Sequence, residues 1–130
     1  MYFDETIRAV GEAYVAHCRN PDNRGKVAPL YASFATSREP IELQDMPEGV
    51  GPYCEGLDAI ELKHKWFFSQ FDVVEMDVDG PYLHEGSQFG VQFSYQIRHR
   101  ESGETFPSKE LGIFTVQEGK IVQELFYQQV

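Results

Sequence analysis

The second half of the chain alternates apolar and polar residues with the two-residue period of β-strands. The clearest run covers residues 89–97, and its apolar positions are Phe89, Val91, Phe93, Tyr95 and Ile97. Such alternation is typical of a strand with one buried face. Similar patterns predict strands over 72–79, 110–116 and 120–127, with an interruption at Gly80-Pro81 and a hairpin loop at 101–104.

The first half contains two segments with the three- and four-residue spacing of helices. Residues 2–18 form the first, with an apolar face of Phe3, Ile7, Val10, Tyr14 and His17. Residues 56–71 form the stronger one, with one face made of Leu57, Ile60, His64, Phe67 and Phe71. The opposite side of that helix also holds apolar residues, which predicts that it is covered on more than one face.

Three further segments connect these elements. A turn-forming stretch at 20–25 precedes a short second helix predicted over 26–31. Residues 33–43 resemble a strand that Pro40 interrupts, and 45–55 form a loop. Helices mostly precede strands, so we expect one α+β domain spanning 1–130, with about three helices packed on one face of a curved, mixed or antiparallel sheet of four to six strands.

The last two strands carry the acids Glu110 and Glu124 among apolar residues. If residues 117–119 form a three-residue turn, Glu110 opposes Phe126, Gly112 opposes Glu124, and both acids share a face. A two-residue turn at 118–119 would shift the pairing by one and separate them. We favour the three-residue turn. Both faces are apolar in either register, which favours a homodimer formed through the sheet.

Composition excludes several classes of partner. The 130 residues carry a formal net charge of −10, whereas nucleic acids and anionic membrane surfaces require clustered Lys and Arg. No apolar run has transmembrane length, and the acidic start lacks the features of a secretory signal. Cys18 and Cys54 have no metal-binding spacing, and reduced thiols are the simpler interpretation, although a disulfide is conceivable. We therefore expect a cytoplasmic protein that binds neither nucleic acid nor membrane.

Several motifs together resemble the nuclear transport factor 2-like (NTF2-like) superfamily, and within it the SnoaL-like proteins. The motifs are Leu30-Tyr31-Ala32, residues 55–60, Gly80-Pro81-Tyr82, residues 89–93 and residues 119–122. The resemblance implies a cone-shaped sheet wrapped around a long helix, with an apolar cavity at one end. Members include ketosteroid isomerases, polyketide cyclases, dehydratases and binding modules without chemistry, so the fold alone is a weak guide to function.

The resemblance also implies catalytic candidates. Ketosteroid isomerase-like members place a carboxylate base on the first strand and a hydroxyl donor on the first helix, where this chain has Glu39 and Tyr14. Glu110 is the candidate for a second, neutral acid. The alternative for Glu39 is a place beside Arg38 on a solvated edge. Glu110 and Glu124 would either share a proton or pair with cations such as Lys109 or Arg98.

The remaining candidates would line a ligand cavity. They are Glu124, His64, Trp66, Phe67, His84, Phe93, Tyr95 and Phe114, each of which is also a common packing or rim residue. SnoaL-like cyclases often end their last strand with an acid-base Asp, where this chain has Gln128 and Gln129, and amides do not titrate. No motif indicates a metal or cofactor. We expect a SnoaL-like protein that binds a small apolar ligand, with isomerase- or cyclase-type proton transfer as the catalytic hypothesis. The alternative is a non-catalytic small-molecule-binding or dimerisation module.

Overall fold

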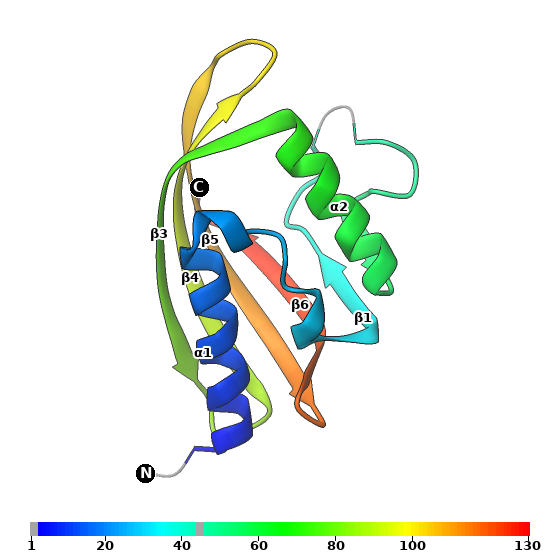
Figure 1. Ribbon diagram of the computed structural model, residues 1–130, viewed down its shortest axis with the longest axis vertical. Coiled ribbons are helices and arrows are strands. Elements are labelled where there is room, and N and C mark those ends of the chain that lie inside the picture. The colour runs from blue at the N-terminus through cyan, green and yellow to red at the C-terminus, as the bar shows by residue number, and fades with distance from the viewer. Residues whose placement is uncertain (1–2, 44–45) are drawn as a thin grey trace.

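A six-stranded mixed sheet curls around two α-helices in the computed structural model, which describes residues 3–43 and 46–130 (Figure 1). The helices are α1 (Glu5–Arg19) and α2 (Leu57–Gln70). The strands are β1 (Tyr31–Arg38), β2 (Tyr53–Glu55), β3 (Phe71–Leu83), β4 (Gln88–His99), β5 (Thr105–Gln117) and β6 (Lys120–Gln128). Their order is β2-β1-β6-β5-β4-β3, and β1 runs parallel to β6. The predicted α+β class is confirmed.

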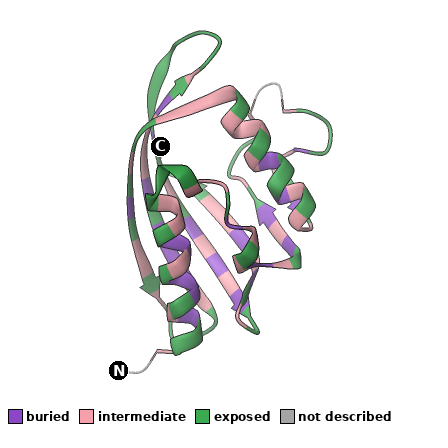
Figure 2. Cartoon of the chain, in the orientation of Figure 1, coloured by how far each residue is buried: buried purple, intermediate pink, exposed green. Residues whose placement is uncertain are grey.

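Helix α1 packs its predicted apolar face onto β3 and β4. Asp4 caps its start, because the carboxylate accepts hydrogen bonds from the backbone N–H groups of Thr6 and Ile7 at 2.8 and 3.2 Å. Buried residues follow one side of the helix, as Figure 2 shows, and include Ile7, Val10 and Tyr14. The prediction placed the start at residue 2, which lies outside the described residues.

The short helix predicted over 26–31 is wrong. The structure has a single 3-10 turn at Ala28–Leu30, with a similar turn at Pro21–Asn23, and Tyr31 already belongs to β1. Pro29 is compatible with the first turn of a helix, but Tyr31 pairs with Ile121 in the sheet and so ends the turn.

Strand β1 ends at Arg38, before Pro40, although we predicted that it would extend to residue 43. Proline cannot donate to a strand ladder, so pairing stops near it. The predicted loop 45–55 contains the short strand β2, which pairs with the end of β1; Asp45 lies outside the described residues.

Strand β3 continues through Gly80-Pro81, where we predicted an interruption. Pairing with β4 shifts between Asp79 and Tyr82 and then resumes. Gly80 has φ +148°, and a Cβ there would lie 3.0 Å from the Gly90 carbonyl oxygen. A side chain at this position would therefore clash with the neighbouring strand, and glycine lets the strand pass through the irregularity.

The closing hairpin has a two-residue turn, so the favoured three-residue turn is wrong. Gln117 pairs with Lys120, and the central residues Glu118 and Gly119 have φ of 51° and 77°. Positive φ at both central residues is the signature of a type I′ turn, whose twist matches that of the strands it joins.

The two acids nevertheless share a face, because a bulge cancels the shift that this turn introduces. Val116 pairs with Ile121, whereas Thr115 pairs with Gln123, so Val122 is an extra residue in β6. Beyond the bulge, Phe114 pairs with Glu124 and Glu110 pairs with Gln128. Residues 110, 112, 114, 124, 126 and 128 therefore point to the same side of the sheet.

Both helices lie on that side. The ring of Tyr14 from α1 packs on Phe114 with 4.5 Å between centroids, and Lys63 from α2 contacts Glu124. The opposite face of the sheet exposes apolar side chains, including Phe34 at 67% and Tyr127 at 53%. On the second apolar side predicted for α2, Leu62 is 48% exposed, whereas Ala59 packs against the core and Trp66 lines the cavity described below.

The two-residue turn predicts that Glu118→Asn stabilises the protein. A non-glycine residue in the left-handed region costs about 1–2 kcal/mol, and Asn tolerates this region better than Glu. We expect the substitution to raise the free energy of unfolding by about 0.5–1 kcal/mol, measured by urea denaturation. Gln117→Asn, at a strand position, should give no such gain. Equal effects at both positions would contradict the observed turn.

Candidate functional site

A cavity of about 220 Å³ lies between the helices and the concave face of the sheet. Its wall is largely aromatic and includes Trp66, Phe67, Phe68, Phe71, Phe93, Tyr95, Phe106 and Phe126. Ligand pockets for drug-sized molecules usually measure roughly 300–1,000 Å³. The cavity therefore suits a smaller, mainly apolar molecule.

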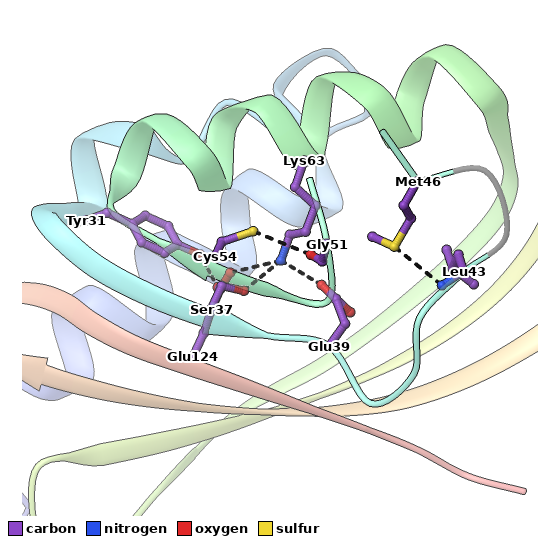
Figure 3. A network of polar contacts seen from close by, with 9 residues as sticks. All are labelled: Tyr31, Ser37, Glu39, Leu43, Met46, Gly51, Cys54, Lys63 and Glu124. Atoms are coloured by element: carbon purple, nitrogen blue, oxygen red, sulfur yellow. Dashed lines mark hydrogen bonds and ion pairs between the residues drawn. The ribbon is translucent and has the colours of Figure 1, made fainter. Parts of the chain in front are cut away.

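Lys63 forms the centre of a buried polar network beside this cavity (Figure 3). Its Nζ donates hydrogen bonds to Ser37 Oγ at 2.6 Å and to Glu39 Oε1 at 2.7 Å, and it lies 3.8 Å from Glu124 Oε1. The Lys63 side chain is only 6% exposed. Burial alone lowers the pKa of Lys63, but the carboxylates of Glu39 and Glu124 outweigh it and raise this pKa overall. The lysine is therefore a fixed cation that joins α2 to β1 and β6.

Glu124 is completely buried at the base of the network. Its Oε2 accepts a hydrogen bond from the hydroxyl of Tyr31. Burial, followed by the nearby Glu124 charge, raises the pKa of Tyr31 well above its usual value, so this phenol remains a proton donor. Within the described part of the chain, Glu124 Oε1 has no hydrogen-bond partner and is held only by the Lys63 charge.

Glu110 is a carboxyl of the cavity wall whose pKa lies near neutral pH. Within residues 3–43 and 46–130 its carboxyl forms neither a hydrogen bond nor an ion pair, although it lines the cavity. Burial and, to a smaller degree, the negative charge of Glu39 raise the pKa of Glu110 to about 7, while Lys63 acts in the opposite direction. The carboxyl is therefore close to half-protonated at neutral pH.

Of the two arrangements weighed for Glu110 and Glu124, a shared proton is absent, and pairing with a cation is present for Glu124 alone, with Lys63 in place of Lys109 or Arg98. Glu124 binds Tyr31 and Lys63 instead of sharing a proton with Glu110, and Arg98 binds Asp72 at 3.3 Å. Glu39, not Glu124, is the carboxylate whose charge acts on Glu110. Glu39 also faces the cavity and pairs with Lys63, while the guanidinium of Arg38 lies 4.5 Å from the Tyr53 ring centre.

Neutral donors complete the polar part of the wall. Burial raises the pKa values of Tyr14 and Tyr95 well above the usual value for tyrosine, and it raises the pKa of Cys18 to about 12. Burial, with a smaller contribution from Lys63, lowers the pKa of His64 to about 4. At neutral pH the cavity thus presents phenols, a thiol and an uncharged imidazole around the acids.

The structure brings most of the predicted site residues together. Those that line the cavity are Tyr14, Glu39, His64, Trp66, Phe67, Phe93, Tyr95 and Glu110. The other three do not line it. Glu124 lies in the buried network, and Phe114 packs in the core between Tyr14 and Phe89. His84 is exposed in the turn that joins β3 to β4.

Three residues of the site, Lys63, Ser37 and Arg24, were not among the predicted ones. Lys63 had a usable signal, because it lies three residues after Ile60 and four before Phe67 on the inward side of α2. Ser37 and Arg24 had none, because their proximity to the cavity depends on the course of the chain between α1 and β1 and along β1.

The structure also bears on two further classes of partner, metal ions and membranes. Among the described residues, no cluster of three or more His, Cys, Asp or Glu side chains has the arrangement to hold a metal ion. No helix in the described ranges combines the length and apolar character needed to cross a membrane. Cys18 and Cys54 are both free.

Solved structures with the same fold cover nearly the whole chain. A proposed SnoaL-like polyketide cyclase from Mesorhizobium loti is 26% identical, with coverage of 98% of this chain and 99% of that one and a TM-score of 0.75. A protein with a ketosteroid isomerase-like fold from Catenulispora acidiphila, in complex with trimethylamine, is 13% identical over 97% and 86% of the two chains, with a TM-score of 0.65. An NTF2-like protein from Burkholderia xenovorans is 13% identical over 96% and 90%, with a TM-score of 0.70.

These likenesses confirm the resemblance seen in the sequence: the chain has the NTF2-like fold of the SnoaL-like and ketosteroid isomerase-like proteins. No family model matches the chain, and no curated protein does so either.

The buried network predicts that Lys63→Met strongly destabilises the protein. Removal of the cation leaves the buried carboxyl group of Glu124 with the Tyr31 hydroxyl as its remaining partner, and loss of one member of a buried ion pair typically costs about 3–5 kcal/mol. Chemical denaturation of the variant and of Lys65→Met, an exposed neighbour, gives the comparison; the control should change by less than about 0.5 kcal/mol. Adding Glu124→Gln to Lys63→Met should recover part of the loss. A Lys63→Met protein as stable as the control would show that the cation is not required.

Proposed function

We propose that the chain binds a small, mainly apolar carbonyl compound in this cavity and catalyses proton transfer at the carbon next to the carbonyl, as in isomerase- or cyclase-type reactions. The observation that carries the proposal is Glu110, an unpaired carboxyl with a pKa near 7 in an aromatic cavity. A general base or acid works best when its pKa lies near the working pH.

Glu110 acts as the proton carrier in this proposal. Its carboxylate removes a proton from the carbon next to the carbonyl, and the electron pair of the C–H bond forms a C=C bond while the carbonyl becomes an enolate. Where the substrate has a C=C bond next to that carbon, the enolate is a dienolate, and protonated Glu110 returns the proton to its γ-carbon while the carbonyl re-forms, which yields an isomer with a shifted double bond. The atoms and electrons of this reaction balance without an oxidant, a metal or a cofactor.

Tyr14 stabilises the enolate oxygen. Its phenol lies on the inward face of α1 and lines the cavity, and its raised pKa keeps it protonated. A neutral donor in an apolar site can stabilise an oxyanion strongly, because water does not compete for it. Tyr95 offers a second phenol of the same kind on β4.

Glu39, which we expected to be the base, takes a supporting role in this proposal. Its Oε1 already accepts a hydrogen bond from Lys63 at 2.7 Å, whereas the Glu110 carboxyl has no such partner. The held charge of Glu39 contributes to the raised pKa of Glu110. Glu39 and Lys63 together therefore adjust the basicity of Glu110.

A second candidate function is binding without turnover. The Catenulispora protein was solved with trimethylamine, a small molecule, and shares the fold of this chain. The cavity of this chain would serve a binding role equally well, with the acids setting ligand polarity. Catalysis and binding differ in whether the ligand's α-hydrogens exchange with solvent.

Hydrogen exchange into a panel of simple carbonyl compounds tests the catalytic proposal. Small ketones, aldehydes and keto acids are incubated with the protein in D₂O, and loss of the α-proton signal is followed by NMR. We expect faster exchange for at least one compound, a rate that rises with pH through about 7 as Glu110 ionises, and a loss of about 10²–10⁴-fold in Glu110→Gln.

The control variant is Glu101→Gln, at an exposed turn. Folding of Glu110→Gln is checked by its stability as a function of pH. Because folding raises the pKa of Glu110 from 4.5 to about 7, ionisation penalises the folded wild-type protein increasingly between these two values. The variant should therefore gain relative stability as pH rises through this window. A folded Glu110→Gln protein with undiminished exchange would refute Glu110 as proton carrier and favour the binding role.

We also propose that two copies associate through the outer face of the sheet. Leu111 and Tyr127 are cross-strand partners there, and together with Phe34 they expose apolar surface. Sedimentation velocity should show a dimer at micromolar concentration, and Tyr127→Glu should shift it to monomer, because a charge there would be buried at the interface. Glu104→Gln is the matched control, and a monomeric wild-type protein would contradict the proposal.

A cytoplasmic location is part of the same proposal. Cys18 and Cys54 are free thiols, and Cys54 is buried. Reduced cysteines are typical of reducing compartments.

A further inference from the structure

We propose that Arg24 binds a carboxylate on the ligand, so that the ligand class is small carbonyl-containing carboxylic acids. This inference rests on the proposed use of the cavity as a ligand site. It adds the chemical group that fixes the orientation of the ligand within it.

Arg24 is held at the cavity wall by the segment between α1 and β1. The next residue, Gly25, has φ +79°, and a Cβ there would lie 2.9 Å from Phe68 Cε2. The backbone therefore packs closely against α2 in a conformation that favours glycine. This contact fixes where the Arg24 side chain enters the cavity, whose lining includes Arg24 itself together with Gly25, His64 and Phe68.

The Arg24 guanidinium has an unused donor. Its Nε is shielded from solvent and has no hydrogen-bond partner within the described residues. A donor atom that is shielded from water and has no partner is costly. A ligand carboxylate suits the Arg24 guanidinium as a whole, because its two oxygens match the planar fork of arginine.

Three other arginines near the sheet have hydrogen-bond or ion-pair partners, and Arg38 lies over the Tyr53 ring. Arg19 donates to the Val78 carbonyl oxygen at 2.8 and 3.1 Å. Arg98 and Arg100 pair with Asp72. In the cavity itself, Lys63 is satisfied by Glu39 and Ser37. Among the described residues, Arg24 is thus the cavity cation with no protein anion bound to it.

The position of Arg24 is compatible with the proposed chemistry. The positive charge of Arg24 acts to lower the pKa values of Cys18 and Tyr95, and the charge of Glu110, on β5, acts to raise the pKa of Tyr95. Tyr95 therefore lies within electrostatic reach of both the cation and the proton carrier. The small cavity limits the rest of the ligand to about one ring or a short chain.

Binding of benzoate and benzamide tests this inference, because the two probes have nearly the same shape and differ in charge. Isothermal titration calorimetry is carried out at pH 7 with the wild-type protein, Arg24→Gln, Arg24→Lys and the control Arg100→Gln. We expect the wild-type protein and the control to prefer benzoate by about 10–100-fold, the range that a charge-assisted hydrogen-bonded pair provides.

The Arg24→Gln variant should bind both probes within about threefold of each other, with benzamide affinity unchanged. Arg24→Lys should show an intermediate preference, since it keeps the charge and loses the bidentate geometry. Circular dichroism and thermal melts establish that each variant is folded. The inference is overturned if the wild-type protein fails to bind benzoate, if it binds both probes equally, or if the preference survives in Arg24→Gln.

The outcome is distinguishable from that of the proposed function, because the titration requires no turnover. Glu110→Gln should retain the preference for benzoate while it loses α-hydrogen exchange. A preference for benzoate without exchange in the wild-type protein would refute catalysis and retain the Arg24 site. Exchange that depends on Glu110, without any preference for benzoate, would retain catalysis and refute the Arg24 site.

Discussion

The site depends on one buried cation, Lys63, which lies between the carboxylate of Glu39, just after β1, and that of Glu124 in β6. It connects α2 to the end of β1 through Glu39 and to β6 through Glu124. Buried ion pairs contribute little to stability compared with well-packed apolar residues, but breaking one is costly. The consequence here is geometric: α2 has one favourable position over the sheet, and that position forms the cavity wall. The aromatic residues that follow Lys63 on the helix, Trp66 to Phe68, are thereby directed into the cavity.

The sheet satisfies this constraint through its register. Glu124 meets Lys63 and Glu110 faces the cavity because the even-numbered residues of β5 point inward together with those of β6 beyond the bulge. The two-residue turn alone would have sent one acid to the outer face. The extra residue at Val122 restores the parity, so turn and bulge act as a pair. A local irregularity of one residue thus determines whether the site exists.

The difference between what could and could not be predicted follows from the range of each interaction. The inward face of α1, and with it Tyr14, follows from helical spacing, and the alternation in 89–97 identifies the inward residues of β4. Glu39 was located only through the family resemblance. The contacts of Lys63 join residues 24 positions apart and more, and the bulge leaves no local pattern. Pairing across such separations depends on the whole fold, so a sequence pattern indicates the direction of Lys63 but not its partners.

The two acids of the cavity, Glu39 and Glu110, differ in how their charges are balanced, and repulsion between them explains the difference. Two ionised carboxylates facing an aromatic cavity would repel each other and destabilise the fold. Lys63 holds the charge of Glu39, and this leaves Glu110 as the acid that responds to the remaining field, with burial the larger cause of its raised pKa. Pairing Glu110 as well would stabilise the protein and abolish its titration near neutral pH. A satisfied acid beside an unsatisfied one is the arrangement expected where stability is given up for proton transfer.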